Sequence, residues 1–199
     1  YDYGMLLYRK AIDILKKRGF SAEKEYNGLI YEAIQNIKKS TGIWEKLNDY
    51  NRILSGLKTV GVLYEVLGDL LKSAEYFLQA LQKAEAQHDL GNKLKLIIRI
   101  IPIQKALGKW EDNLKLIESV LFNVSDYSFI DLISLSYFHK ELGIARWKLK
   151  QEKFAVAELI TALNTIKKQP QLFGEISEIL KNIIAIYTEL NEPDKVEYY

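Results

Sequence analysis

The segment from residue 57 to 84 constrains the fold of this chain more than any other, and it reads LKTVGVLYEVLGDLLKSAEYFLQALQKA. Apolar residues recur there every three or four positions on both sides of Gly68 and Asp69, which predicts two amphipathic helices joined by a tight turn. Gly61 is small and Phe77 is large, so two such helices can approach closely while the ring fills the space between them. The segment therefore predicts a helical hairpin.

The turn of this hairpin recurs along the chain. Leu67-Gly68-Asp69 is followed by related turns at Leu107-Gly108-Lys109, Leu149-Lys150-Gln151 and Leu190-Asn191-Glu192. Successive turns are 40, 42 and 41 residues apart. Gly61 and Gly143 keep the same phase, because they lie 82 residues, or two periods, apart. A period of this length predicts hairpins that stack side by side, each burying its apolar face against its neighbours.

Apolar periodicity predicts helices over most of the chain. Ser40-Thr41-Gly42 could end or bend the second helix, but the pattern continues through Trp44, which favours one long helix to Leu47. Pro170 and Pro193 fall near helix starts, where a missing N–H costs little. The ten helices that we expect span residues 3–17, 22–47, 50–67, 70–87, 90–107, 110–123, 128–149, 152–168, 171–190 and 193 onward.

The sequence VGVLYEVLGDLLKSAEYFLQALQKA resembles a tetratricopeptide repeat (TPR), with its early glycine, its Gly-Asp turn and its spaced Ala, Phe and Ala. Residues 141–163, ELGIARWKLKQEKFAVAELITAL, resemble the same motif in part, whereas Ile101 and Ile184 replace the early glycine in two other repeats. The period exceeds the roughly 34 residues of the family. In this respect the chain resembles the long repeats of kinesin light chains and of bacterial regulatory proteins that bind peptides or partner domains.

The resemblance covers residues 50–199 and implies an all-α, right-handed α-α superhelix, that is, a TPR-like solenoid of four to five helical hairpins. We expect residues 1–199 to form a single repeat domain that belongs to a longer protein. Its expected parts are a divergent N-terminal hairpin at 1–49 and repeats at 50–89, 90–127, 128–169 and 170–199. The resemblance also implies a non-catalytic scaffold that binds a protein or a peptide.

In solenoids of this family the first helix of each hairpin lines the concave side, and the phase of its core face determines which residues point into that groove. The residues expected to bind a partner are Lys58, Val62, Glu65, Lys95, Ile98, Arg99, Lys105, Tyr137, Lys140, Ile144, Trp147 and Lys181. Lys58, Lys140 and Lys181 occupy the same phase in three repeats. A row of cations beside Tyr137 and Trp147 would suit an acidic or carboxylate-terminated peptide. The alternative is a solvated face whose lysines only keep the surface soluble.

Three positions in the expected groove depart from one binding mode of the family. Members that clamp a C-terminal carboxylate present asparagines beside the lysines, but Val62, Pro102 and Ile144 stand at those places here, which argues against that clamp. Pro102 also lies inside an expected helix, where it removes one backbone hydrogen bond and should kink the helix. The kink would either adjust the curvature locally or shape a pocket.

Composition argues against several other classes of protein. The chain has 28 Lys and Arg against 26 Asp and Glu, and this net charge of +2 argues against nucleic-acid recognition. It has no cysteine, which rules out disulfides and thiolate metal sites and favours a reducing, cytoplasmic location. No apolar run approaches the roughly 18 residues of a membrane span.

Catalysis has little support in the sequence. His88 and His139 are the only histidines, and neither lies in a metal-binding or catalytic motif, so we assign both a structural or surface role. We therefore expect no enzymatic activity, no metal and no cofactor. Self-association into a homo-oligomer through exposed end hairpins is the alternative function. A nucleic-acid-binding helical repeat is a weaker alternative.

Overall fold

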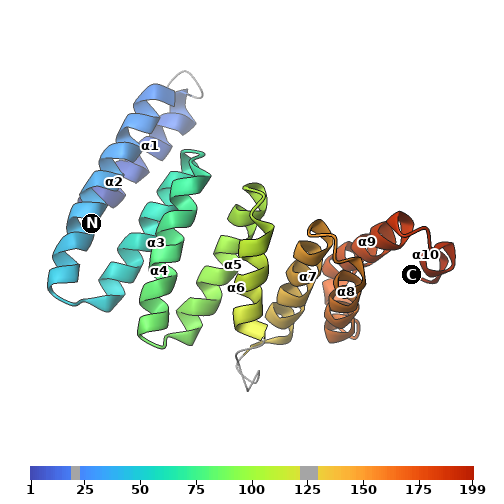
Figure 1. Cartoon of the computed structure of the whole chain (residues 1–199). Coiled ribbons are helices and arrows are strands. Elements are labelled where there is room, and N and C mark those ends of the chain that lie inside the picture. Colours follow the sequence, from blue (N-terminus) through green and yellow to red (C-terminus); the bar gives the residue numbers. More distant parts are fainter. Residues whose placement is uncertain (19–22, 122–129) are drawn as a thin grey trace. The chain divides into compact units, whose positions relative to one another are not determined.

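The structure is a computed structural model that describes residues 1–18, 23–121 and 130–199. These residues form ten α-helices and one short 3-10 helix, without a β-strand, and successive helices run back and forth as hairpins (Figure 1). Over these ranges the all-α prediction is confirmed. The helices are α1 (Asp2–Arg18), α2 (Glu23–Lys46), α3 (Tyr50–Val66), α4 (Leu70–Ala86), α5 (Leu90–Ala106), α6 (Trp110–Leu121), α7 (Leu132–Lys148), α8 (Glu152–Ile166), η2 (Pro170–Leu172), α9 (Phe173–Glu189) and α10 (Pro193–Tyr198).

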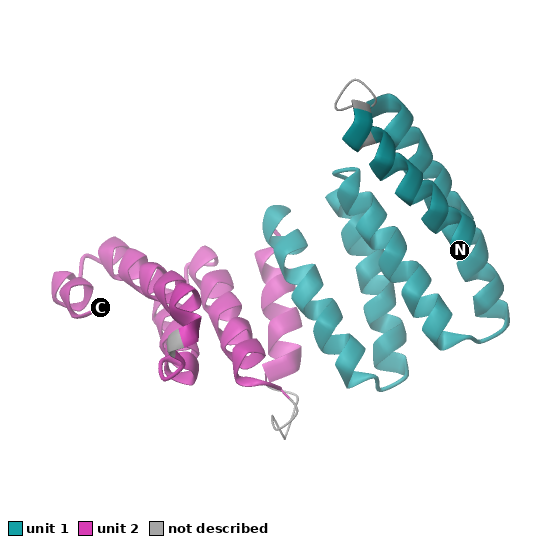
Figure 2. Ribbon diagram, turned by 180° about the vertical axis from the view of Figure 1, so that it is seen from behind, with its two compact units in different colours: residues 1–107 teal, residues 108–199 magenta. Residues whose placement is uncertain are grey.

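Packing divides the chain into two compact units (Figure 2). Unit 1 is Tyr1–Leu107 and holds α1 to α5, and unit 2 is Gly108–Tyr199 and holds α6 to α10. Within each unit a helix packs mainly against the next helix along the chain. This pattern is expected of hairpins that each contact only their sequence neighbours.

Six helices are each followed, two residues after their last residue, by a residue with left-handed backbone conformation. The φ angles of these residues lie between 52 and 76°, and the residues are Asn48, Gly68, His88, Gly108, Lys150 and Asn191. After α3, the Asp69 N–H donates to the Tyr64 carbonyl at 2.9 Å, which closes the helix end as a Schellman motif. After α7, the Gln151 N–H makes the same bond to the Arg146 carbonyl at 2.9 Å. The recurring turns predicted from the sequence therefore share one backbone conformation.

Four helices are immediately preceded by an aspartate that caps the helix N-terminus. Asp49, Asp69, Asp89 and Asp131 each accept a hydrogen bond from the backbone N–H three residues later, at 3.1, 3.0, 2.9 and 2.9 Å. Hydrogen bonds from that same later residue lower the pKa of Asp69, Asp89 and Asp131. Because Asp131 is the cap, α7 begins at Leu132, later than the predicted start at residue 128. Residues 128 and 129 lie outside the described ranges.

Two predicted interruptions leave their helices continuous. α2 runs unbroken through Thr41 and Gly42, and the Thr41 hydroxyl donates to the Ile37 carbonyl at 2.9 Å within the helix. α5 likewise runs from Leu90 to Ala106 with Pro102 inside it and exposed. The favoured single long helix is thus confirmed for α2, whereas the kink at Pro102 stays a prediction.

In unit 1 the core lies between α1, α2 and α3. Ile34 and Ile37 of α2 are fully enclosed, and they pack in one cluster with Leu63 of α3. Gly61 lets α3 approach α4, because a β-carbon there would lie only 3.0 Å from the Phe77 ring. The predicted close approach of these two helices is therefore confirmed.

Gly143 has the same function in unit 2, where α7 packs against α8. A β-carbon at Gly143 would lie 2.8 Å from Leu159 Cγ and 3.0 Å from the Ala155 carbonyl oxygen. Leu159 is fully buried and belongs to the core of this unit, together with Ile183 and Ile186 of α9. The absence of a side chain at Gly143 is thus what allows the α7–α8 hairpin to close.

A polar cluster joins α6, α7 and α8 within unit 2. His139 Nδ1 lies 2.7 Å from Glu158 Oε2, and Arg146 Nη2 lies 3.2 Å from Glu118 Oε1. The Arg146 guanidinium also lies 5.4 Å from the centre of the Phe154 ring. These contacts connect neighbouring helices, which agrees with the structural role assigned to His139.

Candidate functional site

In unit 1 a hollow of about 240 Å³ opens between α3 and α5, with α4 as its floor. Four of the residues predicted from the sequence meet there. The lining consists of Lys58 and Val62 from α3, Phe77 from α4, and Lys95, Leu96 and Arg99 from α5. The hollow therefore combines an apolar floor with three cationic side chains.

Lys58 reaches from α3 to the beginning of α5. Its Nζ donates to Asn92 Oδ1 at 3.4 Å, and Asn92 Nδ2 donates to Asp89 Oδ2 at 2.8 Å. Tyr50 Oη donates to the same Asp89 oxygen at 2.8 Å. Burial and this hydrogen bond raise the pKa of Tyr50 to about 12, so the phenol keeps its proton near neutral pH. These hydrogen bonds hold the Lys58 ammonium against an amide oxygen.

Arg99 lies on the α5 side of the hollow. Its Nη2 donates to Glu65 Oε2 at 2.7 Å, and its guanidinium lies 5.8 Å from the centre of the Phe77 ring. The two charged side chains are 47% and 33% exposed, so this ion pair adds little to folding stability. Glu65, which was also predicted to face the groove, therefore neutralises the charge of one of the three cationic side chains.

The sequence prediction and the lining of this hollow differ in part. Ile98 and Lys105 are half-buried on α5 and are not among the lining residues. Phe77 and Leu96 line the hollow without having been predicted. The prediction considered only the groove-facing positions of first helices. It missed Phe77 because the floor of the hollow comes from a second helix, α4. The large apolar residue at position 77 was the available signal.

In unit 2 a second hollow, of about 150 Å³, lies between α7 and α9. Of the predicted residues, Tyr137 and Lys140 of α7 line it. The other lining residues, which the sequence reasoning missed, are Ile133, Ser136, Ile166, Leu172, Glu175 and Ile179. Ser136 is satisfied within the protein, because its Oγ donates to the Ala162 carbonyl at 2.9 Å. The hollow is thus mainly apolar, with polar groups from two helices at its edge.

Lys140 is held by carboxylates. Its Nζ lies 3.0 Å from Glu178 Oε2 and 3.3 Å from Glu141 Oε1, and 5.5 Å from the centre of the Tyr137 ring. The Lys140 side chain is only 12% exposed. Burial, followed by the nearby charges of Glu141 and Glu178, raises the pKa of Tyr137. The Lys140 ammonium is therefore largely neutralised inside its own unit.

The other predicted residues of unit 2 lie away from this lining. Ile144 is 9% exposed and belongs to the buried core of α7, so it offers little surface to a partner. Trp147 Nε1 donates to Glu189 Oε2 at 2.9 Å, which links α7 to α9. Lys181 is exposed on α9. Whether these three residues bind a partner stays a prediction.

The two hollows are built alike. Each lies between two first helices and receives one residue or more from the second helix between them, α4 in unit 1 and α8 in unit 2. Lys58 and Lys140 are 82 residues apart, two periods, and each lines the hollow of its own unit. The two lysines therefore share the same position in the repeat both in the sequence and in the structure.

No protein-family model matches this chain, and no curated protein sequence matches it. Solved structures are similar to it. The apo form of RapI has a TM-score of 0.70 at 16% identity, over 98% of this chain and 67% of RapI. The nearly identical TPR-like repeats of a Podosopora anserina protein described as a kinesin light chain have a TM-score of 0.68 at 14% identity, over 98% and 89%. MamA from Desulfovibrio magneticus RS-1, from residue 41 to its end, has a TM-score of 0.62 at 12% identity, over 100% and 91%.

These similarities establish the fold. The chain has the TPR-like α-α superhelix that the TPR resemblance implied. Among the residues that the structure describes, every helix is either too short or too polar to span a bilayer. Among the same residues, no three His, Asp or Glu side chains gather as a metal site requires.

Proposed function

We propose that this chain is a non-catalytic, peptide-binding module whose unit 1 hollow receives an apolar side chain flanked by carboxylates. One observation carries the proposal: Lys58, Lys95 and Arg99 surround an apolar floor in one hollow. Charge-assisted hydrogen bonds to carboxylates are stronger than neutral ones, and an apolar floor gives specificity for the side chain between them. The cytoplasmic location expected from the cysteine-free sequence is part of the same proposal.

The charges of this hollow favour an acidic partner even after internal pairing. Arg99 is bonded to Glu65, but Lys58 is bonded to a neutral amide. Lys95 is exposed and forms no ion pair among the residues that the structure describes. A peptide carboxylate therefore meets two ammonium groups without displacing an internal carboxylate from either.

The test uses fluorescein-labelled heptapeptides and fluorescence polarisation. We expect the acidic peptide GEELEEG to bind more tightly than its basic counterpart GKKLKKG. The variant carrying Lys58→Glu and Lys95→Glu should bind GEELEEG at least about tenfold more weakly, the effect of losing one charged hydrogen bond. Comparing GEELEEG with free and amidated C-termini shows whether a terminal carboxylate contributes.

The matched control carries Lys24→Glu and Lys39→Glu, two exposed lysines on α2 of the same unit. It makes the same change in net charge, so it should keep the affinity within about twofold at 0.15 M salt, where distant charges are screened. An equal loss of affinity for GEELEEG in both double variants would contradict the proposal. Light scattering across protein concentrations separates peptide binding from the alternative of self-association.

A further inference from the structure

The hollow of unit 2 has the opposite charge balance to that of unit 1. One ammonium, Lys140, faces three carboxylates: Glu141 and Glu178 are bonded to it, and Glu175 lines the hollow itself. Glu175 is exposed, in the first turn of α9, and Lys181 of the same helix does not line the hollow. The sequence predicted that Lys140 would bind an acidic ligand, but the protein's own carboxylates already occupy that position.

The walls of this hollow suit one ring-sized apolar group. Ile166, Leu172 and Ile179 form its inner surface, and Ile133 stands at its edge with 54% of its surface exposed. Its volume is about 150 Å³. An apolar cavity of about this size binds benzene in another protein, which sets the scale for a single aromatic side chain.

The charges at the rim decide what can accompany that side chain. A ligand carboxylate would have to displace Glu178 from Lys140, and it would approach Glu175 against like-charge repulsion. A ligand cation would meet Glu175 directly, and Glu178 is 54% exposed on the adjacent turn of α9. The electrostatics of the rim therefore favour a basic neighbour.

We propose that the unit 2 hollow binds an aromatic side chain of a peptide with basic residues beside it. This inference rests on the proposed function, since it assigns the hollow between first helices a peptide ligand. It makes the two units select opposite charges, although Lys58 and Lys140 occupy the same position in the repeat. Lys140 then acts as a positioning residue that holds Glu178 at the rim.

The test uses three labelled peptides, GKKFKKG, GEEFEEG and GKKAKKG, with fluorescence polarisation on the full chain. GKKFKKG should bind more tightly than GKKAKKG, because it adds the ring. The affinity for GEEFEEG should not depend on Glu175, because an apolar side chain between carboxylates suits the unit 1 hollow instead. Glu175→Lys should weaken the binding of GKKFKKG by about fivefold or more, the effect of reversing one nearby charge. Ile133→Trp, which fills the edge of the hollow, should weaken it to the level of GKKAKKG.

Two control variants match these changes. Glu111→Lys reverses an exposed acidic residue in the first turn of α6, as Glu175→Lys does in α9. Leu132→Trp adds the same ring at the neighbouring position, which is 52% exposed and does not line the hollow. Both should leave the affinity for GKKFKKG within about twofold, because neither contacts the hollow. Circular dichroism and urea midpoints confirm that each variant folds.

The proposal is overturned by any of three results: GKKAKKG binds as tightly as GKKFKKG, Glu175→Lys weakens GEEFEEG as much as GKKFKKG, or Glu175→Lys and Glu111→Lys have equal effects on GKKFKKG. The acidic peptide GEELEEG separates this outcome from failure of the proposed function. If the affinity for GEELEEG still depends on Lys58 and Lys95 but not on Glu175, the unit 1 hollow binds peptides. In that case only the inference about unit 2 is wrong.

Discussion

The close packing of α7 on α8 predicts that adding one methyl group at Gly143 destabilises unit 2. In a helix, alanine is favoured over glycine by about 1 kcal/mol, so Gly143→Ala would stabilise an uncrowded site. Here, however, the new β-carbon would lie 2.8 Å from Leu159 Cγ and 3.0 Å from the Ala155 carbonyl oxygen. Leu159 would have to move by about 0.7 Å to reach the ~3.5 Å of an ordinary carbon contact.

The sign of the effect follows from which atoms can move. Leu159 is fully buried, and the Ala155 oxygen belongs to the backbone of α8, so α7 and α8 must separate. Overpacking of this kind costs about 1–3 kcal/mol, which exceeds the gain in helix propensity. We expect a net loss of about 1–2 kcal/mol in the free energy of unfolding, or a Tm lower by about 2–6 °C.

Urea denaturation followed by circular dichroism at 222 nm measures this change. Gly174→Ala is the matched control, because it lies in α9 of the same unit and a β-carbon there would meet no atom within 4 Å. It should be neutral or stabilising by up to about 1 kcal/mol. If Gly143→Ala is as stable as the unaltered chain while Gly174→Ala behaves as expected, the packing account of the hairpin is refuted.

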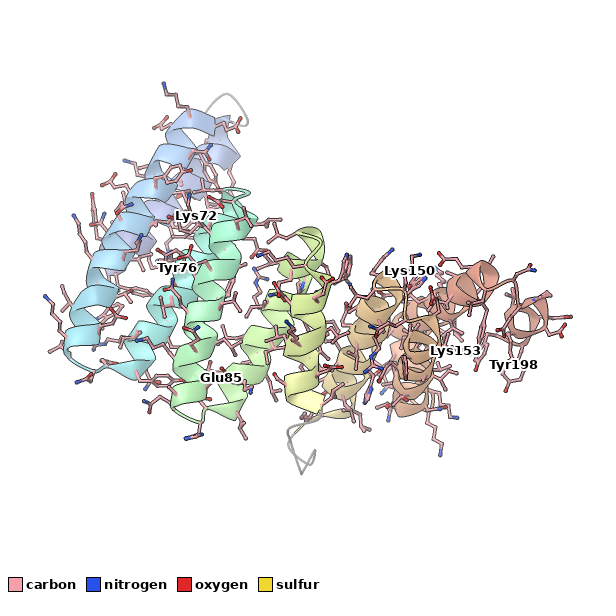
Figure 3. The ribbon with its side chains drawn as sticks, viewed as in Figure 1. Lys72, Tyr76, Glu85, Lys150, Lys153 and Tyr198 are labelled. Carbon is pink, nitrogen blue, oxygen red and sulfur yellow. The ribbon has the colours of Figure 1, made fainter. Side chains whose placement is uncertain are left out.

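Two further predictions concern the helix ends of unit 2. Lys150, labelled in Figure 3, has a left-handed backbone with φ of 61°, so Lys150→Gly should raise the free energy of unfolding by about 1 kcal/mol, whereas Lys150→Ala should not; thermal denaturation tests both. Asp131→Ala removes the α7 cap and should cost about 1 kcal/mol at pH 7. Folding lowers the pKa of Asp131, so the cap stabilises above the unfolded carboxyl pKa near 3.9 and is lost as pH falls through the folded pKa. The difference between Asp131→Ala and the unaltered chain should therefore disappear in acid.

The hairpins could be predicted from the sequence because local contacts specify them. The turn after α3 closes through a bond between Asp69 and Tyr64, only five residues apart, and the Asp69 side chain caps α4 three residues ahead. Asn48 and Lys150 adopt the same left-handed conformation as Gly68 although neither is glycine. The backbone conformation of the turn is therefore repeated more faithfully than its amino-acid sequence. This explains why the motif is recognisable in one repeat and only partial in others.

The hollows could be predicted only in part, because their lining depends on contacts between different repeats. The phase of one helix assigned Lys58 and Lys140 to the same position, and each lines a hollow, since that phase is a property of a single helix. It could not place Phe77 or Leu172, which come from other elements. It did not predict that Ile144 is only 9% exposed, because the extent of burial depends on how closely the adjacent helices pack.

The charge of each hollow depends on the helix that follows, not on the lysine that the repeats share. Lys58 meets Asn92, 34 residues later, and Lys140 meets Glu178, 38 residues later. The side chains that the next first helix presents therefore decide whether the same lysine remains available to a ligand or becomes part of an internal ion pair. A repeat protein can change the specificity of one hollow in this way without altering its core, because these partners lie at the rim, on partly exposed positions. Reading such a groove from sequence thus requires each cation to be considered with the residues one repeat further along.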